Sequence, residues 1–184
     1  MLHFQRGITL PVTFLLLLTA LTIGASAAQM AMLGEKAARA ERDRLIAFQA
    51  AEDALKDAER DINAGLGQPV EVPAQPSGDA TPAWQLVDLA GDGGTEYGAL
   101  TGAAMETGHG NLPFRRPRYL VERIVYAPSA FYYRVTVIGF GPRSGAEAVL
   151  QTTYTPPVPV RRYSWREIMD WQALHAAASG EGQP

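Results

Sequence analysis

The sequence contains no cysteine, so a disulfide scaffold and a thiol nucleophile are both excluded. Only three histidines occur, at His3, His109 and His175, and each stands alone. Isolated imidazoles of this kind supply neither a metal site nor an acid–base dyad. Ser129 and Ser144 lie in expected turns without a nucleophile elbow. We therefore expect no enzymatic activity, no cofactor and no metal.

Formal charge is absent from one long segment, residues 8–34, which follows a short leader (residues 1–7) that carries Arg6. The core of this segment, Thr13 to Ile23, is almost entirely apolar. At a rise of about 1.5 Å per residue, some 20 such residues cross a hydrocarbon layer roughly 30 Å thick. Lipid offers no partner to the backbone, so the segment should be helical. The basic leader predicts that it remains in the cytoplasm while the rest of the chain lies outside.

Charge elsewhere is modest, with a net value of −3. The segment 65–111 carries six acidic residues and no Lys or Arg, whereas residues 112–184 carry nine arginines against five acids. Several of the arginines are clustered in the stretch Arg115 to Arg118 and in the pair Arg161-Arg162. Stacking aromatics are not interleaved with these arginines, so direct nucleic-acid binding is not expected and a solvated or subunit-contacting face is favoured.

Residues 35–64 predict an amphipathic stem that continues the membrane helix, since proline and glycine are absent between Glu35 and Asn63. Two charged pairs at i,i+4 spacing, Glu35/Arg39 and Glu52/Lys56, support it. The whole helix should be roughly 80 Å long and end before Gly65. A stripe of large apolar side chains at helical spacing predicts the face that packs on a sheet: Leu45, Phe48, Leu55 and Ile62.

Closely spaced glycines and prolines predict that residues 65–82 are a linker. The globular domain is expected to follow it, at residues 83–178. From Arg118 onward apolar residues recur at every second position, as they do in β-strands. This spacing predicts an antiparallel three-stranded meander: Tyr119–Tyr126, Phe131–Phe140 and Ala146–Tyr154.

Three smaller elements complete the expected domain. Ala83 to Ala90 should form a short first strand. Ser164 and Glu167 form a capping-box pattern, which predicts a C-terminal helix from Ser164 to about Ala178. We expect its tryptophans to pack on the protein's own sheet; the alternative is an exposed aromatic face that contacts a neighbouring subunit. Residues 179–184 should form a frayed tail.

Several stretches resemble the PilX-type minor pilins of type IV pili. They are Arg6-Gly7 before the apolar run, Ala47 to Leu55 (Ala-Phe-Gln-Ala-Ala-Glu-Asp-Ala-Leu), Tyr133 to Thr136, and Val149 to Tyr154. The resemblance implies an α+β pilin fold, in which a long N-terminal helix packs on a small antiparallel sheet. It also implies a prepilin peptidase that cuts after Gly7 and methylates Ile8.

The same resemblance implies a function in assembly of a type IV pilus, at its start or tip. The chain would lie in the bacterial inner membrane with its domain in the periplasm, and later at the pilus tip or cell surface. Partners would be other minor pilins, the major pilin and a tip adhesin; motility, adhesion and DNA uptake would depend on it indirectly. The helix would pack among other pilin helices through apolar residues, including Leu10, Val12, Phe14, Leu17 and Leu21.

Two departures from the pilin pattern are visible. The fifth mature position, usually glutamate, is Val12, and the common C-terminal disulfide is missing. In pilins that glutamate is thought to pair with the amino terminus of a neighbouring subunit. Its absence favours a subunit with no neighbour above it, at the tip rather than along the filament.

Two alternatives stay open at this stage. A type II secretion pseudopilin shares this plan, although its tip subunit usually has a larger domain. Alternatively, Ala25-Ser26-Ala27 resembles a signal-peptidase site, which would release a secreted binding domain that begins at Ala28.

Overall fold

The computed structural model describes residues 9–73, 81–127, 130–155 and 161–180. The leader and the predicted processing site, Gly7 and Ile8, lie outside these residues, as does the end of the tail. The chain divides into two compact units, the first ending at Glu41 and the second beginning at Arg42. The helix α1 contributes to both, and each unit is described by itself.

Helix α1 runs from Thr9 to Ala64, which confirms the predicted long N-terminal helix. It ends at Gly65, whose φ of 61° places it in the left-handed region. The Gly65 N–H donates to the Ile62 carbonyl and the Leu66 N–H to the Asp61 carbonyl. These two bonds form a Schellman motif, which satisfies carbonyls that the end of a helix leaves unpaired. Within the helix the Glu35–Arg39 pair forms as predicted, whereas Lys56 pairs with Asp53 rather than with Glu52.

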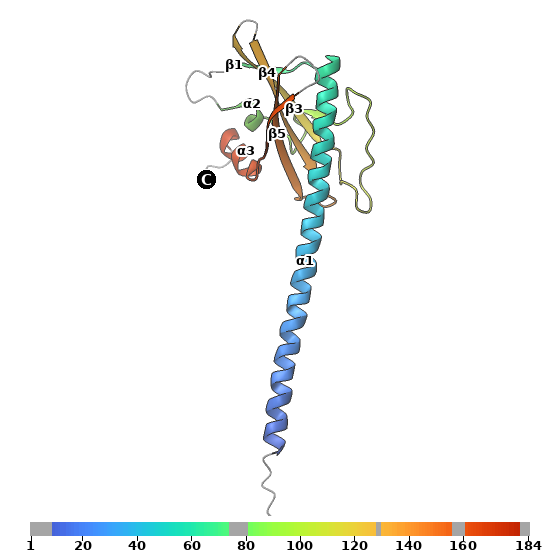
Figure 1. Ribbon diagram of the computed structural model, residues 1–184, viewed down its shortest axis with the longest axis vertical. Coiled ribbons are helices and arrows are strands. Elements are labelled where there is room, and N and C mark those ends of the chain that lie inside the picture. Colours follow the sequence, from blue (N-terminus) through green and yellow to red (C-terminus); the bar gives the residue numbers. More distant parts are fainter. Residues whose placement is uncertain (1–8, 74–80, 128–129, 156–160, 181–184) are drawn as a thin grey trace, which may run out of the picture. The chain divides into compact units, whose positions relative to one another are not determined.

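The second unit contains a sheet (Figure 1). Its strand order is β1-β3-β4-β5-β6. The strands are β1 (Val70–Pro73), β2 (Thr95–Glu96), β3 (Arg118–Ala127), β4 (Ala130–Phe140), β5 (Glu147–Thr155) and β6 (Arg161–Glu167). The antiparallel meander β3-β4-β5 is confirmed, and β6 extends it in the same sense. β1 pairs in parallel with β3, so the sheet is mixed.

Three local predictions were wrong. The expected linker, residues 65–82, contains β1, with Pro73 on an edge strand where a missing N–H is tolerated. The expected strand Ala83 to Ala90 is instead a helical turn, α2 (Ala83–Leu86), followed by turns.

The third error concerns the C-terminal helix, because Ser164 to Glu167 belongs to β6. Helix α3 (Trp171–Ser179) begins after Asp170. Trp165 lies opposite Thr152 in the ladder between β5 and β6, so pairing with a neighbouring strand outweighed the local capping pattern.

One face of the sheet packs on α1. The core here contains Leu55 of the helix and Val135, Val137 and Leu150 of the strands, all buried. Phe48 and Ile62 of the helix are partly buried and pack against it. Leu45 differs from the expectation, because it is 54% exposed. Small residues of the helix are buried against the sheet as well: Ala47, Ala50, Ala51, Ala54 and Ala58.

Gly139 of β4 sets how closely the helix approaches. A Cβ atom at this position would overlap the carbonyl oxygen of Ala47 and the amide nitrogen of Ala51. Both are backbone atoms of α1, so no side chain can move aside. The small residues of helix and strand therefore bring the two backbones closer than large side chains would allow.

The opposite face of the sheet is also apolar and is covered by α2 and α3. Its core contains Ile138, Phe140 and Val149 from the strands, and Trp84 and Trp171 from the helices. The two tryptophan rings lie 6.0 Å apart. His175 stacks on Trp171 and contacts the Gln85 carbonyl oxygen at 2.7 Å, which links α3 to α2. Self-packing of the C-terminal tryptophans is thus confirmed for Trp171, whereas Trp165 is 46% exposed.

Two buried carboxylates near the end of α1 fix the following loops. Asp57 accepts hydrogen bonds from the Gly98 N–H (2.7 Å) and the Thr101 hydroxyl. Asp61 accepts from the Gly67 N–H (2.6 Å) and the Tyr119 hydroxyl (3.2 Å). A buried carboxylate is tolerated where hydrogen-bond donors replace its water.

The contact at Gly139 can be tested by Gly139→Ala. Because the added methyl group meets helix backbone, we expect a loss of about 1–3 kcal/mol in the free energy of unfolding. Urea unfolding of the full chain in detergent, followed by tryptophan fluorescence, measures it, since all three tryptophans lie in the second unit. Gly34→Ala is the control, because a Cβ atom there meets nothing within 4 Å. Equal stability of Gly139→Ala and wild type would contradict the packing described.

Tyr119 supplies a pH-dependent test. Burial raises the pKa of its phenol well above the ordinary value of 10.0, and Asp61 and Asp57 raise it further. Folding therefore favours the protonated phenol of Tyr119. The resulting contribution to the free energy of unfolding is fully present below pH 10 and is lost as the pH rises towards the folded-state pKa.

We expect the free energy of unfolding to fall more steeply between pH 9 and pH 11 (about one unit either side of the ordinary pKa) in wild type than in Tyr119→Phe. At pH 8 the variant should lose about 1–3 kcal/mol, because the buried Asp61 carboxylate loses a hydrogen-bond donor. Urea unfolding of both proteins across this range provides the comparison. Parallel pH profiles would show that the phenol of Tyr119 does not titrate differently in the folded chain.

Candidate assembly interface

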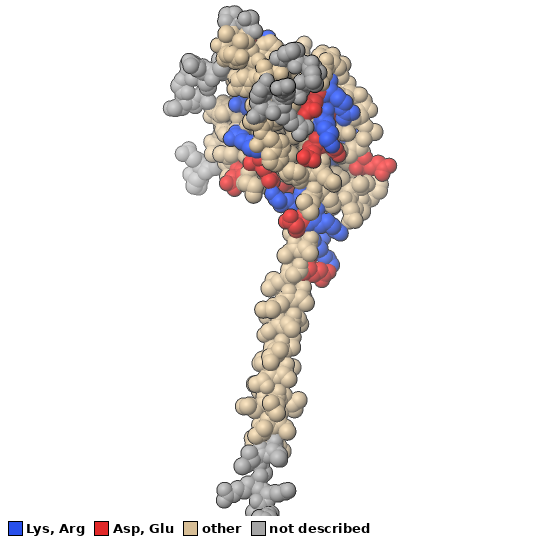
Figure 2. Space-filling view, viewed as in Figure 1, with Lys and Arg blue, Asp and Glu red and all other residues tan. Residues whose placement is uncertain are grey.

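The first unit presents apolar side chains around the whole circumference of α1. The large ones between Leu10 and Leu33 are between 49% and 76% exposed. The visible surface of the free part of the helix carries no Lys, Arg, Asp or Glu (Figure 2), and the sequence places none between Thr9 and Gly34. A helix that is apolar on all sides is normally buried in lipid or among other helices. α1 holds the candidate membrane span of the described residues.

The polar atoms of this segment are satisfied within the helix itself. The hydroxyls of Thr13, Thr19, Thr22 and Ser26 donate to backbone carbonyls three or four residues earlier, at 2.8–2.9 Å. Such bonds leave no hydroxyl hydrogen in need of water. The helix can therefore enter an environment without water at little polar cost.

All five residues predicted for helix assembly are exposed on this segment: Leu10, Val12, Phe14, Leu17 and Leu21. Val12, the position at which pilins usually carry glutamate, is 49% exposed and apolar. The partners of these side chains in an assembly are addressed under the proposed function.

The arginine cluster at residues 115–118 has a different role from the one expected. Arg115 lies over the Phe140 ring, 3.9 Å from its centroid, and donates to the Ala90 carbonyl. Arg118 donates to the carbonyl oxygens of Gly93 (3.0 Å) and Asp92 (2.9 Å). These two side chains hold the loop that precedes β2, so the solvated or subunit-contacting interpretation was wrong for them. The sequence carries no signal of this, because a guanidinium over an aromatic ring depends on tertiary packing.

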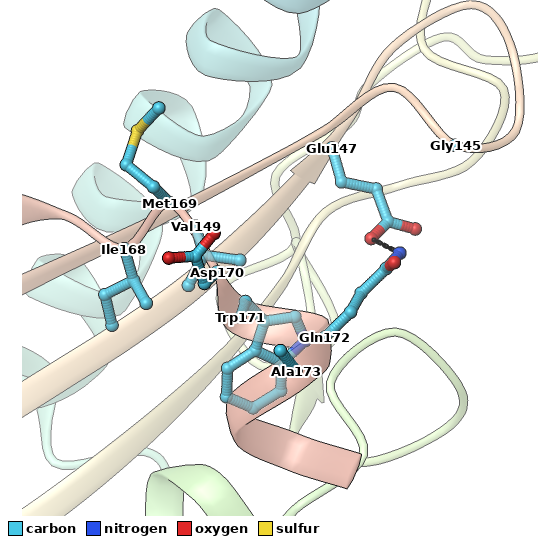
Figure 3. Close-up of a pocket in the computed structure, with 9 residues that line it drawn as sticks. All are labelled: Gly145, Glu147, Val149, Ile168, Met169, Asp170, Trp171, Gln172 and Ala173. Atoms are coloured by element: carbon cyan, nitrogen blue, oxygen red, sulfur yellow. Dashed lines mark hydrogen bonds between the residues drawn. The ribbon is translucent and has the colours of Figure 1, made fainter. Parts of the chain in front are cut away.

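A cavity of about 350 Å³ lies where β6 leaves the sheet and α3 begins (Figure 3). Glu147 and Gln172 reach towards each other beside it and form a hydrogen bond of 3.1 Å. Asp170 and the exposed Met169 also line it. Its lining residues include no nucleophile with an adjacent base. In the part of the chain that the structure describes, no group of three potential metal ligands occurs.

Comparison with known families adds independent support. One family model, described as PilX N-terminal, matches residues 6–56, and another, described as Type IV pilus assembly protein PilX C-term, matches residues 64–156. The second match alone covers just over half of the 184 residues. No curated protein and no solved structure matches the chain.

A long apolar helix, a sheet packed on its second half and these two matches define a type IV pilus assembly protein. The chain belongs to the PilX family. The resemblance found in the sequence is thereby confirmed, and membrane anchoring through α1 agrees with it.

The apolar surface of α1 can be tested by Leu17→Lys. A lysine near the centre of a membrane helix costs about 2.5–3.5 kcal/mol, so we expect the variant to be retained less well in membranes. Carbonate extraction of membranes followed by immunoblotting measures retention. Leu17→Ala, which changes size without adding charge, should behave like wild type. Full retention of the lysine variant would argue against Leu17 facing lipid.

Proposed function

We propose that this protein is a minor pilin that helps to initiate a type IV pilus and lies at its tip. The observation that carries the proposal is the charge-free surface of α1 from Leu10 to Leu33, exposed on all sides in a chain of the PilX family. Such a surface needs lipid before assembly and other helices afterwards.

Processing comes first in the proposed sequence of events. A prepilin peptidase cuts after Gly7, and Ile8 becomes the methylated amino terminus. The α1 segment stays in the bacterial inner membrane, and the second unit lies in the periplasm. The basic Arg6 in the leader supports this orientation.

Assembly then exchanges lipid contacts for helix contacts. Lipid tails and pilin helices are similarly apolar, so the exchange depends on close packing rather than on hydrophobic burial. Gly24, Ser26 and Ala27 are small enough to permit such packing. The partners proposed are other minor pilins, the major pilin and a tip adhesin, and motility, adhesion and DNA uptake would depend on the chain indirectly.

The tip position is proposed because Val12 offers no carboxylate. A subunit within the filament would use that carboxylate to neutralise the amino terminus of the next subunit. Valine cannot do so, which is tolerable where no subunit follows.

The amino terminus of the mature protein tests this function. Edman sequencing of the protein from membranes should begin at N-methylated Ile8, whereas a secreted module would begin at Ala28. Gly7→Ala should impair removal of the leader and reduce the contribution of the chain to piliation, because Gly7 precedes the proposed cut. Normal processing and normal pili in this variant would refute the proposal.

A further inference from the structure

Strand β6 lies at one edge of the sheet, with β5 as its neighbour among the described strands. The Ile168 N–H donates to the Val149 carbonyl at 2.8 Å. Antiparallel pairing alternates, so the backbone groups of Arg166 point towards β5, and those of Trp165 and Glu167 point away from it. Ser164, Trp165 and Arg166 are exposed, so this edge presents open donors and acceptors.

The open edge runs beside α1. Arg44 of the helix donates two hydrogen bonds to the Glu167 carboxylate, at 2.8 and 2.9 Å. The Trp165 ring lies 5.9 Å from that of Phe48. Leu45 precedes Phe48 by about one helical turn, and it is the stem leucine that the sheet leaves exposed. Trp165 and Leu45 thus place apolar surface along the same edge.

Glu52 adds a charge to this flank of the helix. It lies two turns after Leu45 and therefore on the same side of α1. It is half-buried, and among the side chains that the structure describes, which leave out those of residues 161–163, none forms an ion pair with it. A half-buried carboxylate without a cation favours a partner that carries Lys or Arg.

We infer that β6 is the docking site for an extended segment of another pilus protein, which pairs with its open edge. The backbone of the segment bonds to Trp165 and Glu167, an apolar side chain packs on Trp165 and Leu45, and a Lys or Arg faces Glu52. The inference rests on the proposed function, since it supplies the contact by which the subunit joins its neighbours.

Proline at Trp165 tests the backbone contact. The Trp165 N–H points away from β5, so Trp165→Pro removes the donor offered to the partner and keeps the ladder with β5. We expect at least a tenfold loss of surface pili in Trp165→Pro and a smaller loss in Trp165→Ala, at matched protein levels and matched thermal unfolding temperatures. Equal piliation of the two variants would overturn the backbone contact.

Leu45→Glu provides a second variant that does not touch the sheet. We expect it to reduce piliation, whereas Leu86→Glu, a matched exposed leucine on α2, should not. Wild-type piliation in Leu45→Glu and Trp165→Pro together would overturn the inference. A deletion strain separates failure of this inference from failure of the proposed function. If the protein has no function in pilus assembly, the deletion strain should carry normal pili; if only the β6 contact is wrong, it should lack them.

Direct contact can be measured by photocrosslinking in piliated cells. A benzoylphenylalanine at position 45 should give an adduct with a strand-like peptide of another pilus protein, identified by mass spectrometry, and Trp165→Pro should abolish it. The same probe at Asp92, a fully exposed residue in the loop before β2, serves as the control. An adduct that forms equally in Trp165→Pro, or equally from position 92, would contradict docking at β6.

Discussion

The close approach of α1 to β4 is the constraint on which the second unit depends. It is possible because alanines line the helix and Gly139 faces them, so that backbone meets backbone with no intervening side chain. Once the helix lies so close, the carboxylates of Asp57 and Asp61 enter the interior, where water cannot solvate them. The loops at residues 65–68 and 97–103 then bring their N–H groups and a hydroxyl to these acids. The conformation of the loops is thus tied to the position of the helix through these hydrogen bonds.

Much of this architecture is predictable from the sequence, because hydrophobic period and the absence of helix breakers are local properties. The long helix, its end at Gly65 and the β3-β4-β5 meander all depend on such properties. The errors arise where contacts with residues far away in the sequence determine the local structure. Ser164 to Glu167 has the local pattern of a helix start, yet it pairs with β5 as a strand. Arg115 has the local pattern of a solvated charge, yet the rings of Phe114 and Phe140 and the carbonyl of Ala90 surround it.

The apolar stripe of the stem shows a limit of a different kind. Leu45 and Leu55 obey the same helical spacing, but Leu55 is buried and Leu45 is 54% exposed. Helical periodicity identifies residues that are expected to be buried. It does not show whether the same chain or another chain buries them. For the assembly helix the same limit is general, since every large apolar side chain from Leu10 to Leu33 lacks a cover within its own unit. An exposed apolar residue in a chain of an assembly family is therefore information about the assembly.

Val12 can be understood in the same terms. In a bilayer a carboxylate is costly unless a cation pairs with it. A chain with valine at this position avoids the cost in the membrane and also forgoes the pairing. Its stability in lipid is then independent of any neighbour, which suits a subunit that must wait in the membrane before a filament exists. The specificity that the missing charge would have supplied must then come from other surfaces, and among the described residues the edge of β6 beside Leu45 and Glu52 combines backbone, apolar and charged groups.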